Sequence, residues 1–419
     1  MDVGRYNYYS FNATGGDGLA SGLVSFTVSP PNDELLNLDA VLQFEVPFRV
    51  PQSNTGIVQL VPFAGSLFIN SQTIELSGGP SFASGGNSSV QAPIITRAFA
   101  ENGSVLQALY GNEPVLASGT VNADALTLAI PDSEPNQALH RTDTRITSSG
   151  EVILNLYHPM ALGVSKIGHI GGGRVVYTFS FTTPSMTALQ ATGTAIPATF
   201  TEDATTFTAV GNPRNFRLKL IGLKPLALPS YLNPANSSQT TIKHYFPKFN
   251  TQSDQYVFQA GSNYSFNFTS AGDVVFGAFS QIWATKPTTQ SNRGLSFGGP
   301  ALAQIQLQHA GANFPLNPLE NRELPLRYAM AHYTSAFAGK NTGESFSAWA
   351  TRPFDAFRIL PPVGTSTSTI QVTIIVSTLD YQKSIVTASD QIRVFMTMGS
   401  IEQLSITYQN SIPIRYDYI

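Results

Sequence analysis

The amino-acid sequence predicts an all-β protein built from two successive antiparallel sandwiches. Three observations support this fold class: short runs in which apolar and polar residues alternate, little helical periodicity, and one proline-rich break between two groups of strand-like runs. Alternation with a period of two is typical of strands that bury only one face. We therefore expect paired antiparallel sheets in both halves of the chain.

The composition is that of a folded β protein with a weakly charged surface. Of the 419 residues, 42% are hydrophobic and 12% are charged, and the formal net charge is −3. Disordered chains are poor in aromatic residues, whereas this chain has 16 Tyr and 27 Phe. Charged residues are about half as frequent as the ~25% of ordinary domains. A surface of this kind suits a protein that packs closely against neighbours, because charges are costly to bury.

The cysteine count and the charge distribution exclude several functions. The chain has no cysteine, which excludes disulfides, thiolate metal sites and cysteine nucleophiles. The first thirty positions carry only three charged residues, Asp2, Arg5 and Asp17, so there is no basic arm. We therefore expect no sequence-specific binding of nucleic acid. Residues Met1–Ser10 do not resemble a signal peptide, and no apolar run is long enough to span a membrane.

Six runs in the first half of the chain are predicted to be strands. Most are rich in β-branched and aromatic residues, and they are bounded by Gly, Pro, Asn or Ser. A short helix is considered only for Ile94–Tyr110, where Gly103 interrupts the pattern. The predicted strands are Leu23–Val28, Ala40–Val46, Ser66–Ile69, Glu151–Leu156, Val175–Phe181 and Phe216–Ile221.

The segment Lys224–Pro234 separates this group from a second one. Three prolines within these eleven residues exclude a helix or a central strand, so we predict a linker. We assign residues 1–223 to a first domain, 224–234 to the linker and 235–419 to a second domain. The strands expected in the second domain are Gln255–Phe258, Tyr264–Phe268, Val274–Phe279, Ile370–Val376, Gln391–Met396, Leu404–Tyr408 and Ile412–Tyr416, with Glu323–Phe337 left ambiguous between helix and strand.

Two stretches rich in Gly, Ser, Thr and Asn are predicted to be long loops. They are Gly78–Gln91 and Thr285–Pro300. Long loops on a compact sandwich usually have a function or make contacts with other molecules.

No catalytic, cofactor-binding or metal-binding residue is predicted, and we expect a protein that is not an enzyme. The glycine-rich segment Gly168–Gly173 lacks the Lys-Ser/Thr of a phosphate-binding loop and lies between strands. Asp143, Glu151 and Glu202 could include a carboxylate pair of the glycosidase kind, but no Ser/His/Asp constellation accompanies them. The six histidines lack the paired spacing that is typical of metal ligands; they are His140, His158, His169, His244, His309 and His332.

Several stretches resemble a known family in their pattern and order. Pro62–Glu75 resembles an early strand pair with a short polar turn, and Leu154–Leu162 followed by Arg174–Phe181 resembles a strand, a proline-containing turn and a second strand. The ending, from Ile370 to Tyr416, is similar to the last strands of a second barrel. With the proline-rich break at Lys224–Pro234 between the halves, the chain resembles the double jelly-roll major capsid proteins of tailless phages, adenoviruses and polinton-like viruses.

This resemblance implies two consecutive eight-stranded jelly rolls and a structural role in a virion. Three copies of the chain would form a pseudo-hexagonal homotrimer that tiles an icosahedral shell. Minor capsid and penton proteins would be further partners, and no cofactor is implied. The two predicted loops would be outer turrets or intersubunit arms. Whether an inner membrane lies under the shell is left open.

Three other functions are compatible with the sequence. A single jelly-roll coat protein with a projection domain often carries a basic arm, which this chain lacks. A trimeric receptor-binding or tail-fibre protein is expected to show repeats along its axis, and we find none. A carbohydrate-active β enzyme or a lectin would need a carboxylate pair or aromatic platforms in one cleft, which a sequence does not show.

Overall fold

The computed structural model confirms an all-β architecture, in which strands dominate and one α-helix, α1 (Ser88–Phe99), lies among the described residues. The structure describes nineteen runs of the chain. They are residues 4–14, 22–31, 33–49, 57–60, 63–84, 88–99, 113–116, 145–146, 151–164, 173–182, 189–192, 212–227, 229–270, 274–283, 302–309, 311–320, 354–357, 369–376 and 391–418.

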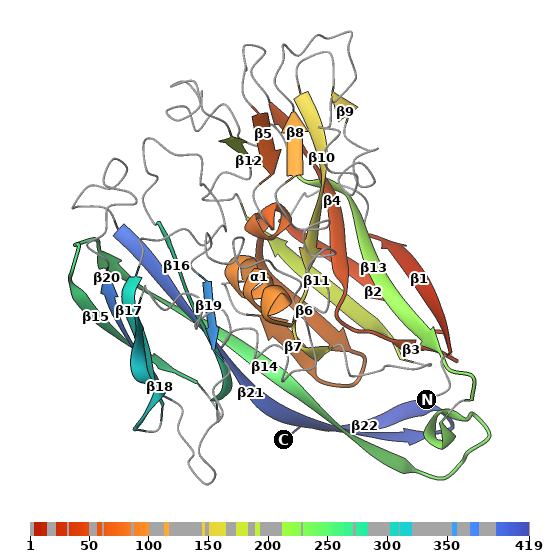
Figure 1. Cartoon of the computed structure of the whole chain (residues 1–419). Helices are drawn as coiled ribbons and strands as arrows, with labels where there is room; N and C mark the ends of the chain where they lie inside the picture. The colour runs from red at the N-terminus through yellow and green to blue at the C-terminus, as the bar shows by residue number, and fades with distance from the viewer. Residues whose placement is uncertain are drawn as a thin grey trace.

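The first half of the chain forms an antiparallel sandwich (Figure 1). Its strands are β1 (Arg5–Asn12), β2 (Leu23–Val28), β3 (Leu35–Leu36), β4 (Val41–Arg49), β6 (Ile69–Leu76), β7 (Ser81–Ser84), β9 (Arg145–Ile146), β10 (Glu151–Pro159), β11 (Val175–Phe181) and β13 (Arg214–Lys224). One sheet has the order β1-β13-β4-β10-β9, with β3 beside β13, and the other has the order β2-β11-β6-β7. A separate small sheet contains β5 (Ile57–Leu60), β8 (Glu113–Leu116) and β12 (Leu189–Thr192).

The second half forms another antiparallel sandwich. Its strands are β14 (Thr240–Val257), β15 (Asn263–Thr269), β16 (Val274–Trp283), β17 (Leu302–His309), β18 (Ala312–Glu320), β19 (Phe354–Phe357), β20 (Thr369–Val376), β21 (Gln391–Gln409) and β22 (Ile412–Tyr418). One sheet has the order β14-β21-β16-β19, with β22 beside β21, and the other has the order β15-β20-β17-β18. A short 3-10 turn at Ser230–Leu232 lies between the two halves.

The two sandwiches have the same strand order. Eight strands of the first half, taken along the chain, are β1, β2, β4, β6, β7, β10, β11 and β13; in the second half they are β14 to β21. In each half, the first, eighth, third and sixth strands form one sheet, and the second, seventh, fourth and fifth form the other. This wrapped order is that of a jelly roll. The expectation of two eight-stranded jelly rolls is therefore confirmed.

Alternation explains how the paired strands make a core. On β2, Val24, Phe26 and Val28 point inward, and the neighbouring β11 buries Tyr177 and Phe179 against them. Strand β20 follows the same rule in the second half, where Ile370, Val372, Ile374 and Val376 are buried and the residues between them are on the outer face. Successive side chains of a strand point to opposite faces, so one apolar stripe per strand suffices to fill a sandwich.

The first core receives side chains from both halves of the chain. Phe395, Leu404 and Ile406 of β21 and Phe246 of β14 pack with the residues of β2, β4 and β11, as does Leu232 of the interdomain turn. Figure 1 shows why: β14 and β21 run on from the second sandwich along one side of the first. The division at residues 223 and 235 therefore stays a prediction.

Several predicted boundaries are corrected by the structure. Ser66–Ile69 is not a strand, because residues Ala64–Phe68 form a 3-10 turn and the strand begins at Ile69; the strand pair expected over Pro62–Glu75 is therefore one turn and one strand. Gln391–Met396 and Leu404–Tyr408 are parts of the one strand β21. Gln255–Phe258 is the end of the long strand β14, except for Phe258.

The expected loop and helix also lie elsewhere. Gly78–Gln91 is not one long loop, since it contains β7 and the first turn of α1. The helix considered for Ile94–Tyr110 begins earlier, at Ser88, and its described part ends at Phe99. Thr285–Pro300 and Glu323–Phe337 lie outside the described residues. No helix among the described residues is long and apolar enough to cross a membrane.

Candidate functional site

The residues considered for catalysis or metal binding are not brought together among the described residues. His158 is buried in the first core, His244 lies on β14 and His309 on β17, while Glu151 begins β10 opposite Arg49. No group of three His, Asp or Glu residues that could hold a metal ion occurs in the described part of the chain. Asp143, Glu202, His140, His169, His332 and most of Gly168–Gly173 lie outside the described residues.

His158 forms a buried polar network in the first jelly roll. Its Nδ1 lies 2.9 Å from Ser66 Oγ and its Nε2 lies 2.9 Å from Gln72 Oε1. Gln72 donates its amide hydrogen to the carbonyl of Met160, which fixes Oε1 as the acceptor of the ring N–H. Nδ1 therefore accepts from the Ser66 hydroxyl. Burial lowers the pKa of His158 to about 3, so the ring is neutral and has a structural role.

The most extensive functional feature is a wall that the two jelly rolls share. It consists of β14 and β21, which pair over their whole length. Val394, Met396 and Met398 point into the second core, whereas Phe395 between them points into the first. A β-strand presents successive side chains to opposite faces, so this stretch of β21 is buried on both. The shared wall joins the two rolls into one body.

The contact between this wall and the β7–α1 side of the first roll, which we call the seam, is closely packed. Phe82 of β7 meets Phe246 of β14 edge to face, with ring centroids 5.4 Å apart. The Thr251 hydroxyl donates to Gln91 Oε1 of α1 at 3.3 Å and lies 2.8 Å from the Thr397 hydroxyl. Gly163 touches β14 so closely that a Cβ there would lie 2.4 Å from the Pro247 carbonyl oxygen. These contacts fix the orientation of the second roll against the β7–α1 side of the first.

The corresponding wall of the first roll has exposed apolar side chains on its outer face. It consists of β1 and β13, which are the first and eighth strands of that roll. Tyr6, Tyr8 and Ile221 project from its outer face and are 57%, 80% and 43% exposed, and Tyr8 pairs directly with Ile221. We call these three residues the tyrosine face. Exposed aromatic residues that are gathered on one face are typical of protein interfaces.

A buried carboxylate holds β1 in place under the tyrosine face. Glu34 is only 4% exposed and accepts hydrogen bonds from Asn7 and from the Tyr9 hydroxyl. Burial and the neighbouring Glu34 raise the pKa of Tyr9, so its hydroxyl stays protonated and remains a donor. The inward side chains of β1 are therefore anchored, and the outward Tyr6 and Tyr8 are presented on an ordered strand.

Neither the shared wall nor the tyrosine face was predicted from the sequence. A usable signal was present for the latter, because Tyr6 and Tyr8 occupy alternate positions of the run Arg5–Asn12 and must lie on one face of a strand. The shared wall gave no comparable signal. Its apolar stretches belong to both cores, and a sequence does not show which core a side chain enters.

No family model and no curated protein matches the sequence. Solved structures do match, at low identity and over nearly the whole chain. The mavirus major capsid protein has 10% identity and a TM-score of 0.57, covering 98% of this chain and 90% of its own. The Sputnik virophage structure has 12% identity and a TM-score of 0.53, covering 100% and 89%. The capsid of the virus PBCV-1 has 8% identity and a TM-score of 0.53, covering 100% and 98%.

These matches are structures of virus particles and their capsid proteins, not of enzymes. They agree with the strand order of both halves, which by itself defines two jelly rolls in one chain. The resemblance drawn from the sequence is thus confirmed at the level of the fold. The chain has the double jelly-roll fold of these major capsid proteins.

Proposed function

We propose that this protein is the major capsid protein of an icosahedral virus and is located in the virion. The observation that carries the proposal is the pair of jelly rolls with identical strand order, fused through the shared wall. The two similar rolls therefore form one rigid structural unit. The whole-chain likeness to major capsid proteins supports the same function.

The low content of charged residues fits this role. Only 12% of the residues are charged, and the tyrosine face presents two rings and an aliphatic side chain, while Lys219 and Arg217 lie further along the same face. Large permanent interfaces resemble a protein core cut in half, and charged residues are depleted at their centres. A shell subunit buries several of its faces in this way.

The tyrosine face supports a homotrimer as the building block. Within one chain, the β14–β21 wall of the second roll packs against the β7–α1 side of the first, which is a contact between two unlike surfaces. Contacts of this heterologous kind close into a ring when the rotation between units allows it. The β1–β13 wall of the first roll is open for the same contact with the second roll of another copy. Three copies, each with two rolls, then give a pseudo-hexagonal ring.

A closed shell also needs partners besides the trimer. Hexagonal tiles alone form a flat sheet, and an icosahedral shell has pentagonal vertices. Penton proteins and minor capsid proteins are therefore the expected partners of this chain.

The proposal is tested by the mass and shape of the purified chain in solution. Light scattering should give three times the chain mass of 45.0 kDa, and negative-stain images should show a hexagonal outline. Tyr8→Glu places a charge on the tyrosine face and should yield monomers, whereas the matched variant Tyr8→Phe should remain trimeric. A wild-type chain that stays monomeric at every concentration would contradict the trimer.

A further inference from the structure

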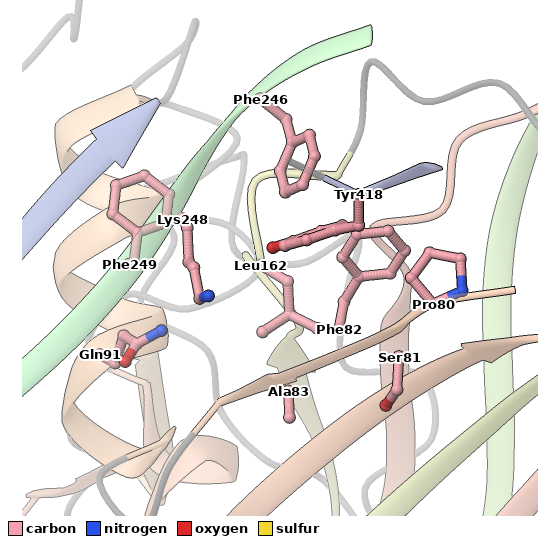
Figure 2. A pocket seen from close by; sticks show the side chains of 10 residues that line it. All are labelled: Pro80, Ser81, Phe82, Ala83, Gln91, Leu162, Phe246, Lys248, Phe249 and Tyr418. Atoms are coloured by element: carbon pink, nitrogen blue, oxygen red, sulfur yellow. The ribbon is translucent and has the colours of Figure 1, made fainter. Parts of the chain in front are cut away.

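A pocket lies in the seam between the two jelly rolls (Figure 2). Its volume is about 320 Å³, which is within the usual range of small-molecule sites. The first roll contributes β7, Leu162 and Gln91 of α1, and the second half of the chain contributes β14 and Tyr418 of β22. The pocket therefore exists only where the two halves of the chain meet.

One part of the pocket is apolar. Figure 2 shows the rings of Phe82, Phe246 and Phe249 around it, with Leu162 between them. Phe82, Phe246 and Leu162 are each at most 6% exposed, so they are fixed by the packing of the seam. This lining suits an aliphatic or aromatic group of a few carbon atoms.

The polar end of the pocket carries a donor that makes no hydrogen bond to any described residue. Gln91 is only 4% exposed, and its Oε1 accepts the hydrogen bond from Thr251 Oγ1. Thr251 in turn lies within hydrogen-bond distance of Thr397, which can donate to it. This chain orients the amide, and Figure 2 shows its nitrogen on the side of Lys248. Among the described residues, no group accepts a hydrogen bond from Gln91 Nε2. The nitrogen is at the pocket, where a ligand or water can accept its hydrogen bond.

The second donor at this end belongs to a neutralised ion pair. Lys248 Nζ lies 2.9 Å from Glu402 Oε1, and Glu402 Oε2 accepts from the Tyr418 hydroxyl. Lys248 also lies over the Tyr418 ring, 5.7 Å from its centroid. An ammonium group has three hydrogens, so two of them are not used by Glu402. The described charges at this end sum to zero, which favours an uncharged acceptor over an anion.

We propose that this seam pocket binds an uncharged amphiphile that has one acceptor oxygen, such as an amide or an alcohol on a short apolar chain. The oxygen accepts from Gln91 Nε2 and Lys248 Nζ, and the apolar chain lies among the rings of Phe82, Phe246 and Phe249. This inference is independent of the proposed capsid function. Because the site is formed by both halves, a bound amphiphile stabilises the seam by binding only the folded chain.

The test uses two probes that differ only in the head group, octanamide and octylammonium, titrated into the purified full-length chain by calorimetry. Octanamide should bind at a single saturable site and raise the temperature of unfolding. Octylammonium has a donor head and should bind at least about tenfold more weakly, the effect of about one hydrogen bond. Equal binding of both probes, or no saturable binding of octanamide, would overturn the proposal.

Two variants locate the site. Gln91→Glu keeps the acceptor for Thr251 and replaces the donor, so the preference should reverse in favour of octylammonium. Gln91→Leu removes the amide donor at nearly the same side-chain volume and should weaken the binding of octanamide at least about tenfold, the effect of about one hydrogen bond. Binding of octanamide by Gln91→Leu with wild-type affinity would show that the probe lies elsewhere and would refute the assignment.

Discussion

The two jelly rolls share a strand order but fill their cores differently. In the first core, Phe44 lies within 6.3 Å, between centroids, of Phe68, Phe181 and Phe216. In the second core, Phe266 lies within 6.4 Å of Tyr256, Phe268 and Phe279, and the methionines of β21, Met396 and Met398, are buried with them. The second core also has no counterpart, among its described residues, of the His158 network.

This difference shows which property of the sequence selects the architecture. Cores with different side chains reach the same order of strands, so the identity of the apolar residues is secondary. What the halves have in common is the alternation of apolar and polar residues and the sequence of connections between strands. The side chains then decide how rigid each core is and how it responds to acid or to truncation.

The largest expected effect comes from truncating one ring on the third strand of each roll. Phe44→Ala should cost about 4–5 kcal/mol and Phe279→Ala about 3 kcal/mol, within the range for buried aromatic residues. Phe44→Ala should cost more than Phe279→Ala because Phe44 contacts three rings, whereas Phe279 has one described ring partner, Phe266. Urea unfolding of both variants measures the difference. Equal losses would mean that the two cores are packed alike.

A smaller effect on the free energy of unfolding is expected at acid pH, and it comes from His158 in the first roll. The pKa of His158 is about 3 in the folded chain, against about 6.5 when unfolded. The unfolded chain therefore binds one more proton at pH 5, and the stability that His158 contributes falls as the pH drops from about 6.5 towards 3. Between pH 7 and pH 5 the loss should be about 2 kcal/mol.

The control for this prediction is His158→Gln, which has no titrating group. Urea unfolding at pH 7 and pH 5 should show a smaller loss in this variant than in the wild type, by about the same 2 kcal/mol. An identical pH dependence in both proteins would show that other groups, such as the partly buried His244, account for the acid response.

An effect of similar size concerns the seam itself. Gly163 has a φ of 83° and lies against Pro247, whereas Gly78 has a φ of 71° and nothing within 4 Å of the position of a Cβ. Gly78→Ala should cost about 1 kcal/mol for the left-handed backbone alone. Gly163→Ala should cost about 1–2 kcal/mol more, since the methyl group must push β14 away. If thermal unfolding gives the same loss for both variants, the seam is looser than the contacts indicate.

Strands that bury one face were predictable from the sequence. Leu23–Val28 and Val175–Phe181 match β2 and β11 residue for residue, because their alternation is clean and turn residues bound them. β1 was missed because its inward and outward positions both carry Tyr, which hides the alternation. β21 was divided in two, since Gly399 and Ser400 interrupt the apolar pattern at the place where the strand leaves one core for the other.

Features that depend on tertiary contacts were not predictable. Leu67 and Phe68 have strand-like character, but Phe63 adopts a φ of 58° and the following residues turn, which places Ser66 against His158. The seam pocket gathers Phe82, Gln91 and Tyr418 from distant parts of the chain, and no local pattern connects them. The jelly-roll fold was accessible through pattern and order, whereas the surfaces that carry function were not.

The shared wall has a consequence for the order in which this protein matures on the ribosome. Domains usually fold as units during synthesis, the N-terminal one first. Here the first roll is synthesised first but lacks Phe395, Leu404 and Ile406, which enter its core from β21. Its hydrophobic interior stays open until the strand that also closes the second roll has emerged. The two rolls therefore complete their folding together, and a nascent chain released before β21 would be a substrate for chaperones.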